Sequence, residues 1–200
     1  QGYFDVGKFS TNLGDLIIDE ACKKLVNDIS HELLSIPTHR RISLFEFYPY
    51  KRIKYWIVGG SNILGNRFFR KGQLPINFLT SLLIQPNLLM MGCGWINGSK
   101  KVGFYNRLKI KLLYPKFAPH SVRDSRTKKL LESIGYKNIF NTGCPTLWNI
   151  DENINDIMPK FKSQNCLFTI TDYLKSFNED KKMIEILLEC YGQIQPFLYH

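Results

Sequence analysis

Residues 8–26, KFSTNLGDLIIDEACKKLV, decide the fold class because they join a strand pattern to a helix pattern. Just before them, the apolar run at residues 3–6 is short enough for a buried strand. From Asp15 onward, apolar residues recur every three or four positions, at Leu16, Ile17, Ile18, Ala21, Cys22, Leu25, Val26 and Ile29. The stretch therefore predicts a β-strand followed closely by an amphipathic α-helix.

The loop between the two patterns carries more polar groups than a turn needs. A turn requires only Gly14, and a helix start requires only one capping residue, yet Asn12, Gly14 and Asp15 are all present. One interpretation is an ordinary capped helix. The other is a binding loop, since ligands of parallel α/β sheets bind beyond the carboxyl ends of the strands.

Strand and helix patterns alternate along the rest of the chain. Strands are predicted at residues 2–6, 42–47, 53–58, 88–92, 120–122, 138–141 and 167–171. Helices are predicted at residues 15–33, 75–84, 104–113, 126–134 and 180–191. This alternation predicts an α/β fold with a doubly wound parallel sheet over residues 1–150. A polar linker at 151–165 and the start of a second domain at 166–200, with its own sheet, complete the expected organisation.

Composition excludes several classes of protein. With 44% hydrophobic residues among 200, the chain can bury one substantial core, or one domain and part of another. The five cysteines contain no Cys-x-x-Cys pair, which argues against a zinc site and a disulfide framework. We expect Cys144 to be a buried packing residue. The longest apolar stretch, residues 78–95, is broken by Gln-Pro-Asn and does not predict a membrane span.

Positive charge is concentrated in the middle of the chain. Of a net charge of +10, residues 51–150 contribute 17 basic and 2 acidic side chains. Nucleic acid, an anionic membrane surface and phosphorylated small molecules all fit such a segment, as does a solvated lysine-rich face. Within it, residues 106–116, NRLKIKLLYPK, predict an amphipathic helix with a basic face. Aromatic residues beside that helix keep a nucleic-acid-binding α/β domain open as an alternative.

Three more loops follow predicted strands and should meet the first loop at one edge of the sheet. They are Gly59-Gly60-Ser61-Asn62, Gly92-Cys93-Gly94-Trp95 and Arg123-Asp124-Ser125. The glycine pair permits close backbone approach, and an arginine beside a helix start suits an anion. Ser125 is the expected helix cap. Arg123 either contacts a ligand or forms an ion pair with Asp124.

The order of these motifs resembles the polysaccharide pyruvyl transferase family. The resemblance rests on Asn-x-Gly-Asp after the first strand, followed by WIVGGSNILG, MMGCGW, APHSVRDSRTKKLLESIGY and FNTGCPTLW, and it covers nearly the whole chain. It implies two Rossmann-like domains in a double-Rossmann, GT-B-like architecture. It also implies transfer of a pyruvyl group from phosphoenolpyruvate to a sugar of a surface polysaccharide, as a ketal.

The resemblance also implies roles for the loop residues. Arg123 would bind the phosphoenolpyruvate donor, while the polar residues of the other loops would line the cleft. The full substrate-binding set is Arg123, Asn12, Asp15, Gly14, Gly59, Gly60, Ser61, Asn62 and Gly94. No metal and no cofactor beyond the donor substrate are expected. The expected location is cytoplasmic, with peripheral contact to the inner face of an anionic membrane where lipid-linked acceptors reside.

One feature of the family is missing from this sequence. Members carry an Arg-x-His element in the second domain, whose histidine is the usual proton donor, and no Arg-x-His occurs here. The four histidines are His31, His39, His120 and His200, and His120 is expected in the core or at a sheet edge. The catalytic residue is therefore unassigned, and we expect this chain alone not to turn over. A substrate-binding relative without catalysis remains an alternative.

Overall fold

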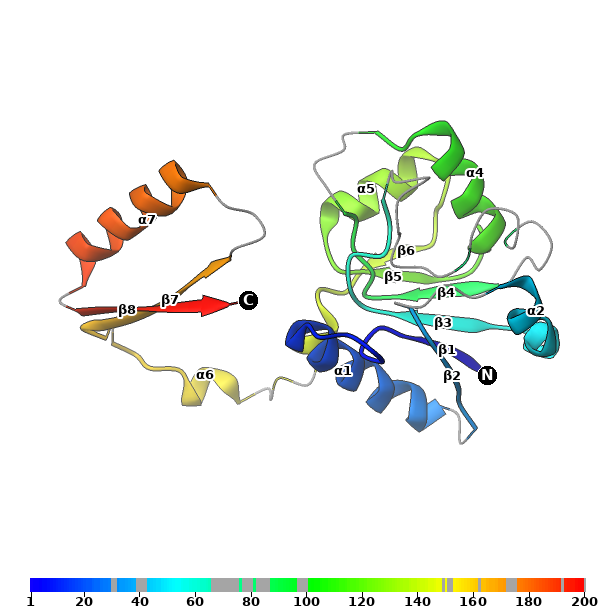
Figure 1. Ribbon diagram of the computed structural model, residues 1–200, viewed down its shortest axis with the longest axis horizontal. Helices are drawn as coiled ribbons and strands as arrows, with labels where there is room; N and C mark the ends of the chain where they lie inside the picture. Colours follow the sequence, from blue (N-terminus) through cyan, green and yellow to red (C-terminus); the bar gives the residue numbers. More distant parts are fainter. Residues whose placement is uncertain are drawn as a thin grey trace. The chain divides into compact units, whose positions relative to one another are not determined.

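The computed structural model divides into two compact units, Gln1–Ile150 and Asp151–His200 (Figure 1). It describes residues 1–29, 32–38, 43–65, 76, 81, 87–96, 101–148, 150, 153–161, 163–171, 176–191 and 193–199. Most of the helix predicted at residues 75–84 lies outside this description, as do His31 and His39.

A parallel sheet with the order β2-β1-β3-β4 forms the centre of the first unit. Its strands are β1 (Gly2–Asp5), β2 (Leu34–Pro37), β3 (Trp56–Gly59) and β4 (Leu88–Met91). A second parallel pair, β5 (His120–Val122) and β6 (Ile139–Asn141), joins the end of β4 through one bridge between Cys93 and Val122. The predicted α/β class with a parallel sheet is confirmed. In this order β2 lies on one side of β1, whereas β3 and β4 lie on its other side. The strand order therefore reverses between β1 and β3, which is the topological switch point of the sheet.

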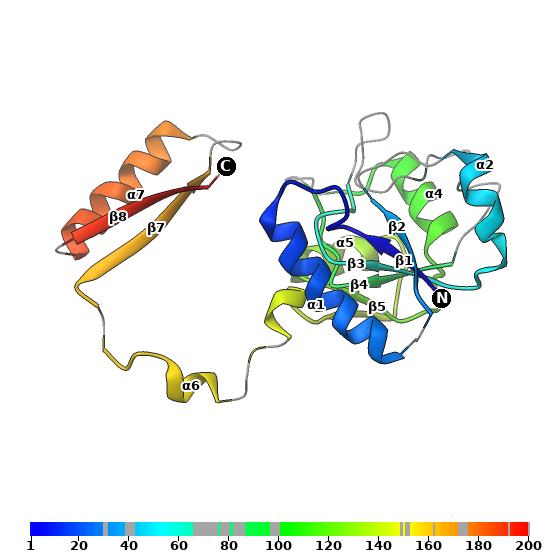
Figure 2. The same cartoon turned by 60° about the horizontal axis from the view of Figure 1, so that its bottom comes forward.

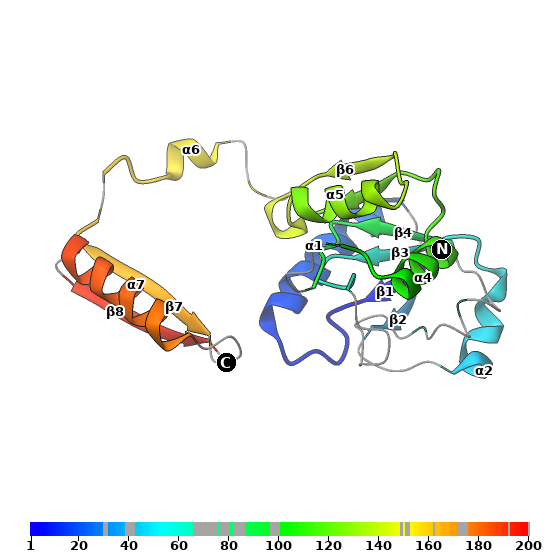
Figure 3. The same ribbon diagram turned by 90° about the horizontal axis from the view of Figure 1, so that it is seen from above.

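Helices cover both faces of the first unit (Figures 1 and 3). Helix α1 (Leu13–Ile29) lies on one face, while α4 (Phe104–Leu113) and α5 (Ser125–Ser133) lie on the other. Side chains of β1 alternate between these faces. Tyr3 packs in the cluster of α1, and Phe4 packs in the opposite cluster with its ring centroid 5.1 Å from that of Trp56. The turned view of Figure 2 shows α1 running across its face of the sheet.

His120 joins β4 to β5 at the place where the backbone ladder is interrupted. The Met90 N–H donates to His120 Nδ1 over 3.3 Å, so the proton lies on Nε2, which donates to the Pro115 carbonyl over 2.9 Å. The ring is 1% exposed and lies between the rings of Tyr114 and Tyr136. His120 is thus a core residue, and burial lowers its pKa despite the hydrogen bond to Pro115.

Two predictions near β2 are wrong. The strand predicted at residues 42–47 is helical where it is described, as α2 (Leu44–Phe47), and continues into the 3-10 helix η1 (Tyr48–Arg52). The helix predicted to reach residue 33 ends at Ile29, and the second strand is instead β2. Leu33 misled the prediction because it continues the apolar helical spacing. Pro37 is tolerated in β2 because this strand is at the edge of the sheet.

The start of α5 also differs from its prediction. Asp124, rather than Ser125, caps the helix, since its Oδ1 accepts the Thr127 N–H over 2.7 Å. The predicted stop at Gly135 is confirmed. Gly135 has φ +95°, and its N–H donates to the Glu132 carbonyl in the arrangement that commonly ends a helix.

The second unit contains a parallel pair of strands with a helix between them in sequence. Strand β7 (Asn165–Thr171) pairs with β8 (Gln193–Tyr199), and α7 (Phe177–Cys190) connects them. As predicted, β7 belongs to a sheet of its own. The segment expected to be a linker contains the short helix α6 (Ile154–Ile157). Strand β8 was not predicted, because Pro196 interrupts its pattern.

We expect the His120 ring to take up its proton at a lower pH than an exposed histidine does, because burial lowers its pKa from the ordinary value of about 6.5. As the pH falls through that ordinary value, the unfolded chain takes up a proton before the folded chain does, so stability should decrease. Nitrogen-15 NMR of the imidazole would show the Nε2–H form persisting below the pH at which an exposed histidine titrates. Titration of His120 near pH 6.5 would contradict its place in the core.

Candidate functional site

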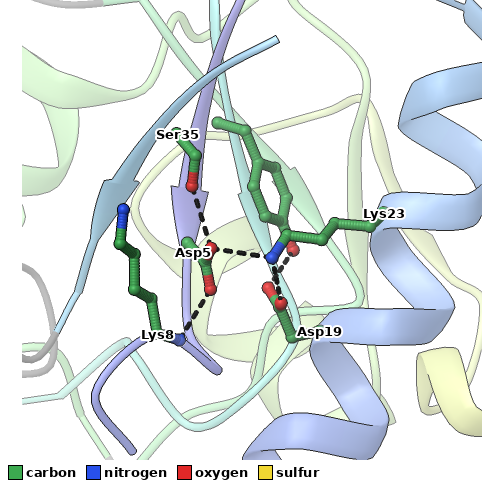
Figure 4. Close-up of polar contacts among 6 residues, drawn as sticks. Asp5, Lys8, Asp19, Lys23 and Ser35 are labelled. Carbon is green, nitrogen blue, oxygen red and sulfur yellow. Dashed lines mark hydrogen bonds and ion pairs between the residues drawn. The ribbon is translucent and has the colours of Figure 1, made fainter.

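A buried carboxylate ends β1 and starts the first loop (Figure 4). Asp5 is 3% exposed and accepts three hydrogen bonds. They come from Lys23 Nζ over 2.7 Å, Ser35 Oγ over 2.8 Å and the Lys8 N–H over 2.7 Å. These donors belong to α1, β2 and the first loop, so one side chain ties three segments of chain together.

Lys23 also bonds a second buried carboxylate, that of Asp19, one turn earlier in α1. The distance from Lys23 Nζ to Asp19 Oδ2 is 2.7 Å, and Tyr3 OH donates to Asp19 Oδ1 over 2.8 Å. We call Asp5, Asp19 and Lys23 the carboxylate clamp. Sequence reasoning missed it, although Asp15, Asp19 and Lys23 recur at a spacing of four and could have indicated one polar stripe on the helix.

The two carboxyls of the clamp have pKa values shifted in opposite directions. Burial opposes ionisation of Asp5, but hydrogen bonds from Lys23, Ser35 and Lys8 outweigh it and lower its pKa. At Asp19, burial together with the charge of Asp5 outweighs the hydrogen bonds from Lys23 and Tyr3 and raises its pKa. The single ammonium group of Lys23 therefore faces two carboxyl groups, and the surroundings favour the charged form at Asp5 but not at Asp19.

The first loop is held by its own polar side chains. Asn12 Oδ1 accepts the Gly14 N–H over 2.9 Å, which makes Asn12 the N-cap of α1. Ser10 Oγ donates to Asp15 Oδ2 over 2.9 Å. Asn12 and Gly14 thus shape the loop, and this part of the stretch is a capped helix start. Asp15 also makes a contact outside this loop.

Asp15 links the loop after β1 to the loop after β3. Its Oδ1 accepts Ser61 Oγ over 3.2 Å, and the residue is 7% exposed. The Gly60-Ser61 backbone makes this approach possible with φ values of +48° and +61°. A Cβ at Gly60 would overlap the side chain of Ile18, so glycine is required there. Gly59 precedes this turn at the buried end of β3.

Gly94 brings the loop after β4 to the same place. Its N–H donates to the Ser61 carbonyl over 2.9 Å. A Cβ at Gly94 would overlap Asn62 Oδ1 and lie 2.7 Å from Arg123 Nε. The side chains of Asn62 and Arg123 therefore both lie against the bare glycine backbone. The Arg123 N–H donates to the Cys93 carbonyl over 3.1 Å, which joins the loop after β5 to this group.

Arg123 does not pair with Asp124. The Asp124 carboxylate bonds Thr127 instead, through its backbone N–H over 2.7 Å and its hydroxyl over 2.8 Å. Thr127 Oγ1 in turn accepts the Trp95 N–H over 3.0 Å, which fixes the loop after β4 to the start of α5. Within the described residues, the Arg123 guanidinium has no carboxylate partner. It is a half-buried cation at the carboxyl edge of the sheet.

The predicted convergence of four loops is therefore present in the structure. Asp15, Ser61, Asn62, Gly94 and Arg123 form a connected group, which we call the switch-point site because it begins at the junction of β1 and β3. The described residues contain no group of three or more His, Cys, Asp or Glu side chains that could hold a metal ion.

Cys144 lies outside the switch-point site. It is half-buried, rather than buried as predicted, and packs against the apolar cluster under α1. An apolar groove of about 370 Å³, lined in part by Leu89, Phe140 and Trp148, shares no lining residue with the switch-point site. Among the described residues that line it, His120 alone is ionisable, and its ring nitrogens are already bonded. These described residues therefore offer no cation to a charged ligand.

Comparison with protein families supplies an independent finding. The family model described as polysaccharide pyruvyl transferase matches residues 12–195, which include the whole switch-point site. Comparisons with curated proteins and with solved structures found no significant match. In the part of the chain that the structure describes, none of the helices has the length and apolar character to cross a bilayer.

Replacing Lys23 with methionine should destabilise the fold by about 2 kcal/mol, since it leaves two buried carboxylates without their cation. The hydrogen bonds that lower the Asp5 pKa stabilise the fold above the unfolded-chain value of about 3.9, and this stabilisation is lost as the pH falls through the lowered value. The difference between wild type and Lys23→Met should therefore shrink below about pH 4. Urea unfolding at pH 7 and again well below pH 4 measures this difference.

The exposed neighbour Lys24 provides the control, because Lys24→Met removes a similar side chain without touching the clamp. We expect that variant to stay within about 0.5 kcal/mol of wild type. A Lys23→Met deficit of equal size at pH 7 and well below pH 4 would mean that the lysine stem, rather than its charge, stabilises the fold.

Gly94→Ala should fold with a stability loss of no more than about 1 kcal/mol, because the atoms nearest to the new methyl belong to the flexible side chains of Asn62 and Arg123. It should displace the Arg123 guanidinium, which the Nε–H signal in an NMR spectrum would report. Gly60→Ala is the contrast: overlap with Ile18 and the positive φ should cost at least about 2 kcal/mol. An unmoved Arg123 signal in Gly94→Ala would contradict the packing described.

Proposed function

This chain belongs to the polysaccharide pyruvyl transferase family, and from that premise we propose that its switch-point site binds phosphoenolpyruvate. The proposed reaction transfers the pyruvyl group to a saccharide as a ketal and releases phosphate, as a step of polysaccharide biosynthesis. Two hydroxyls of the acceptor sugar take the place of the enol phosphate oxygen and the enol double bond.

The proposal rests on the Arg123 guanidinium, which has no carboxylate partner among the residues that the structure describes. Phosphoenolpyruvate presents a phosphate and a carboxylate, and an arginine fork binds either by two parallel hydrogen bonds. Helix α5 begins two residues after Arg123, so the backbone amides of its first turn lie near the same anion. Gly94 has no side chain, which lets the Arg123 side chain lie against its backbone at this edge of the sheet. The position and the charge of Arg123 therefore both suit the donor.

In the proposed reaction the described residues bind and position the donor. An acid must protonate the methylene carbon of the donor, and positive charge then develops at the central carbon, which the sugar hydroxyl attacks. Arg123 would hold the donor while phosphate leaves. Asp15 and Ser61 would fix the loops at their 3.2 Å hydrogen bond, and Asn62 would border the donor. His120 is excluded as the acid because both ring nitrogens are bonded inside the core.

The architecture beyond the first sheet is part of the same proposal. Residues 1–150 would form the first Rossmann-like domain of a GT-B-like enzyme, and residues 166–200 would begin the second domain after a linker at 151–165. The parallel β7-α7-β8 arrangement supports this, since such units build Rossmann-like sheets. We further propose a cytoplasmic location and a saccharide acceptor linked to lipid at the inner membrane face.

The alternative function is that of a donor-binding relative that lacks catalysis. Donor binding without phosphate release, in protein that includes any segment naturally following residue 200, would distinguish that relative from the enzyme.

Arg123→Ala should weaken phosphoenolpyruvate binding by about 1.5–3 kcal/mol, since it removes charge-assisted hydrogen bonds to the donor. Arg123→Lys should lose part of that affinity because it keeps the charge without the planar fork. Titration of phosphoenolpyruvate into the isotope-labelled chain, followed by amide NMR shifts, measures even millimolar binding.

Lys137→Ala is the matched control for this titration. Lys137 is an exposed cation that precedes β6, at the sheet edge opposite the switch-point site. We expect its affinity to equal that of wild type. If wild type and Arg123→Ala bind the donor equally while both are folded, the assignment of Arg123 is wrong.

A further inference from the structure

Helix α4 exposes apolar side chains where a surface helix is normally polar. Its buried residues are Asn106, Ile110 and Leu113, which lie on one face. On the opposite face, Phe104 is 76% exposed and Leu108 is 40% exposed, one turn apart. A helix of a globular domain places its apolar stripe toward the core, so a second apolar stripe on the outside requires a separate explanation.

More exposed aromatic residues and cations occur on α4 and in the segment just after it. Tyr105 is 60% exposed, and its ring packs edge-on against that of Phe104 with centroids 5.7 Å apart. Phe117, just after the helix, is 86% exposed. Arg107, Lys111 and Lys116 are all exposed on the same segment. We call these seven residues, Phe104, Tyr105, Arg107, Leu108, Lys111, Lys116 and Phe117, the α4 patch.

The positive charge of the patch is not compensated by carboxylates of the described residues. Neither Asp nor Glu occurs anywhere between Glu46 and Asp124 in the sequence. In the described part of the chain, Arg107, Lys111 and Lys116 have no carboxylate partner. The patch therefore combines exposed apolar rings with a positive field, and its occupant should offer negative charge around an apolar interior.

We propose that the α4 patch docks on an anionic lipid surface. Phe104, Leu108 and Phe117 enter the boundary between headgroups and acyl chains, while Arg107, Lys111 and Lys116 contact anionic headgroups. By helical spacing, Phe104 and Leu108 lie on the side of α4 that faces away from the core, and Lys111 lies on the same side one turn further along. Leu108 decides against nucleic acid, because an aliphatic side chain at the centre offers no stacking face to a base.

This docking does not depend on the proposed transferase activity, since lipid binding needs neither phosphoenolpyruvate nor Arg123. If both proposals hold, the patch brings the switch-point site to the membrane that carries a lipid-linked acceptor. Lipid docking is measured with vesicles and donor binding with phosphoenolpyruvate, so either proposal can be disproved without the other.

The test is flotation of the 200-residue chain with phosphatidylcholine vesicles, with and without phosphatidylglycerol. We expect binding only to the anionic vesicles, reduced by added salt because exposed charges are screened. The double variant Phe104→Ser, Leu108→Ser should bind at least about tenfold more weakly, since it removes the inserted apolar side chains. Lys111→Gln should weaken binding to anionic vesicles by a smaller factor.

Leu188→Ser is the matched control, because Leu188 is a comparably exposed leucine on α7. It should bind vesicles as wild type does. Thermal unfolding checks that every variant is folded, which we expect because all the substituted side chains are exposed. Equal binding to both kinds of vesicle, no effect of the double variant, or no vesicle binding together with salt-sensitive binding of a single-stranded oligonucleotide would each overturn the proposal.

Discussion

The first unit depends on one ammonium group placed between two buried carboxylates. Lys23 bonds Asp5 at the end of β1 and Asp19 in α1, both over 2.7 Å. Without that cation, two like charges would share a site from which water is largely excluded, and one would have to protonate. Because Asp5 also bonds Ser35 of β2, the clamp fixes α1 against both strands and sets where the first loop begins.

From the clamp, a short series of hydrogen bonds carries that placement across the sheet edge. Asp15 lies one helical turn before Asp19 and bonds Ser61, whose carbonyl accepts the N–H of Gly94. Gly94 then leaves space for Arg123 beside it. Arg123, which follows β5, is thus positioned by a series of contacts that starts at β1 and α1. Its counter-charge is absent from the described residues because Asp124 is engaged as the cap of α5.

The two faces of the sheet in the first unit contribute differently to the structure. The face under α1 supports the loops at the carboxyl edge, whereas the face under α4 and α5 holds most of the buried apolar residues around Trp56 and His120. Asn106, Ile110 and Leu113 anchor α4 to that second core, which leaves its outer side available for another surface. The basic middle of the chain is therefore divided between a half-buried arginine in a ligand site and exposed cations on a helix.

The sequence by itself determined the features that depend on neighbouring residues. Periodicity located α1, α4 and α5 and most strands of the first sheet, and their alternation predicted a parallel sheet whose loops converge, because crossover connections put the carboxyl ends of parallel strands at one edge. The motif order predicted the family that the match over residues 12–195 shows.

Only the tertiary structure decided which partner each polar group chose. Asp124 could bond Arg123 beside it or Thr127 one turn on, and in the fold it bonds Thr127, so Arg123 has no carboxylate partner among the described residues. Local pattern also failed at β2, where Leu33 continues a helical spacing although the strand bonds to β1. The carboxylate clamp was invisible for the same reason. Asp5 and Lys23 are 18 positions apart, and their 2.7 Å contact exists only once α1 has packed against β1.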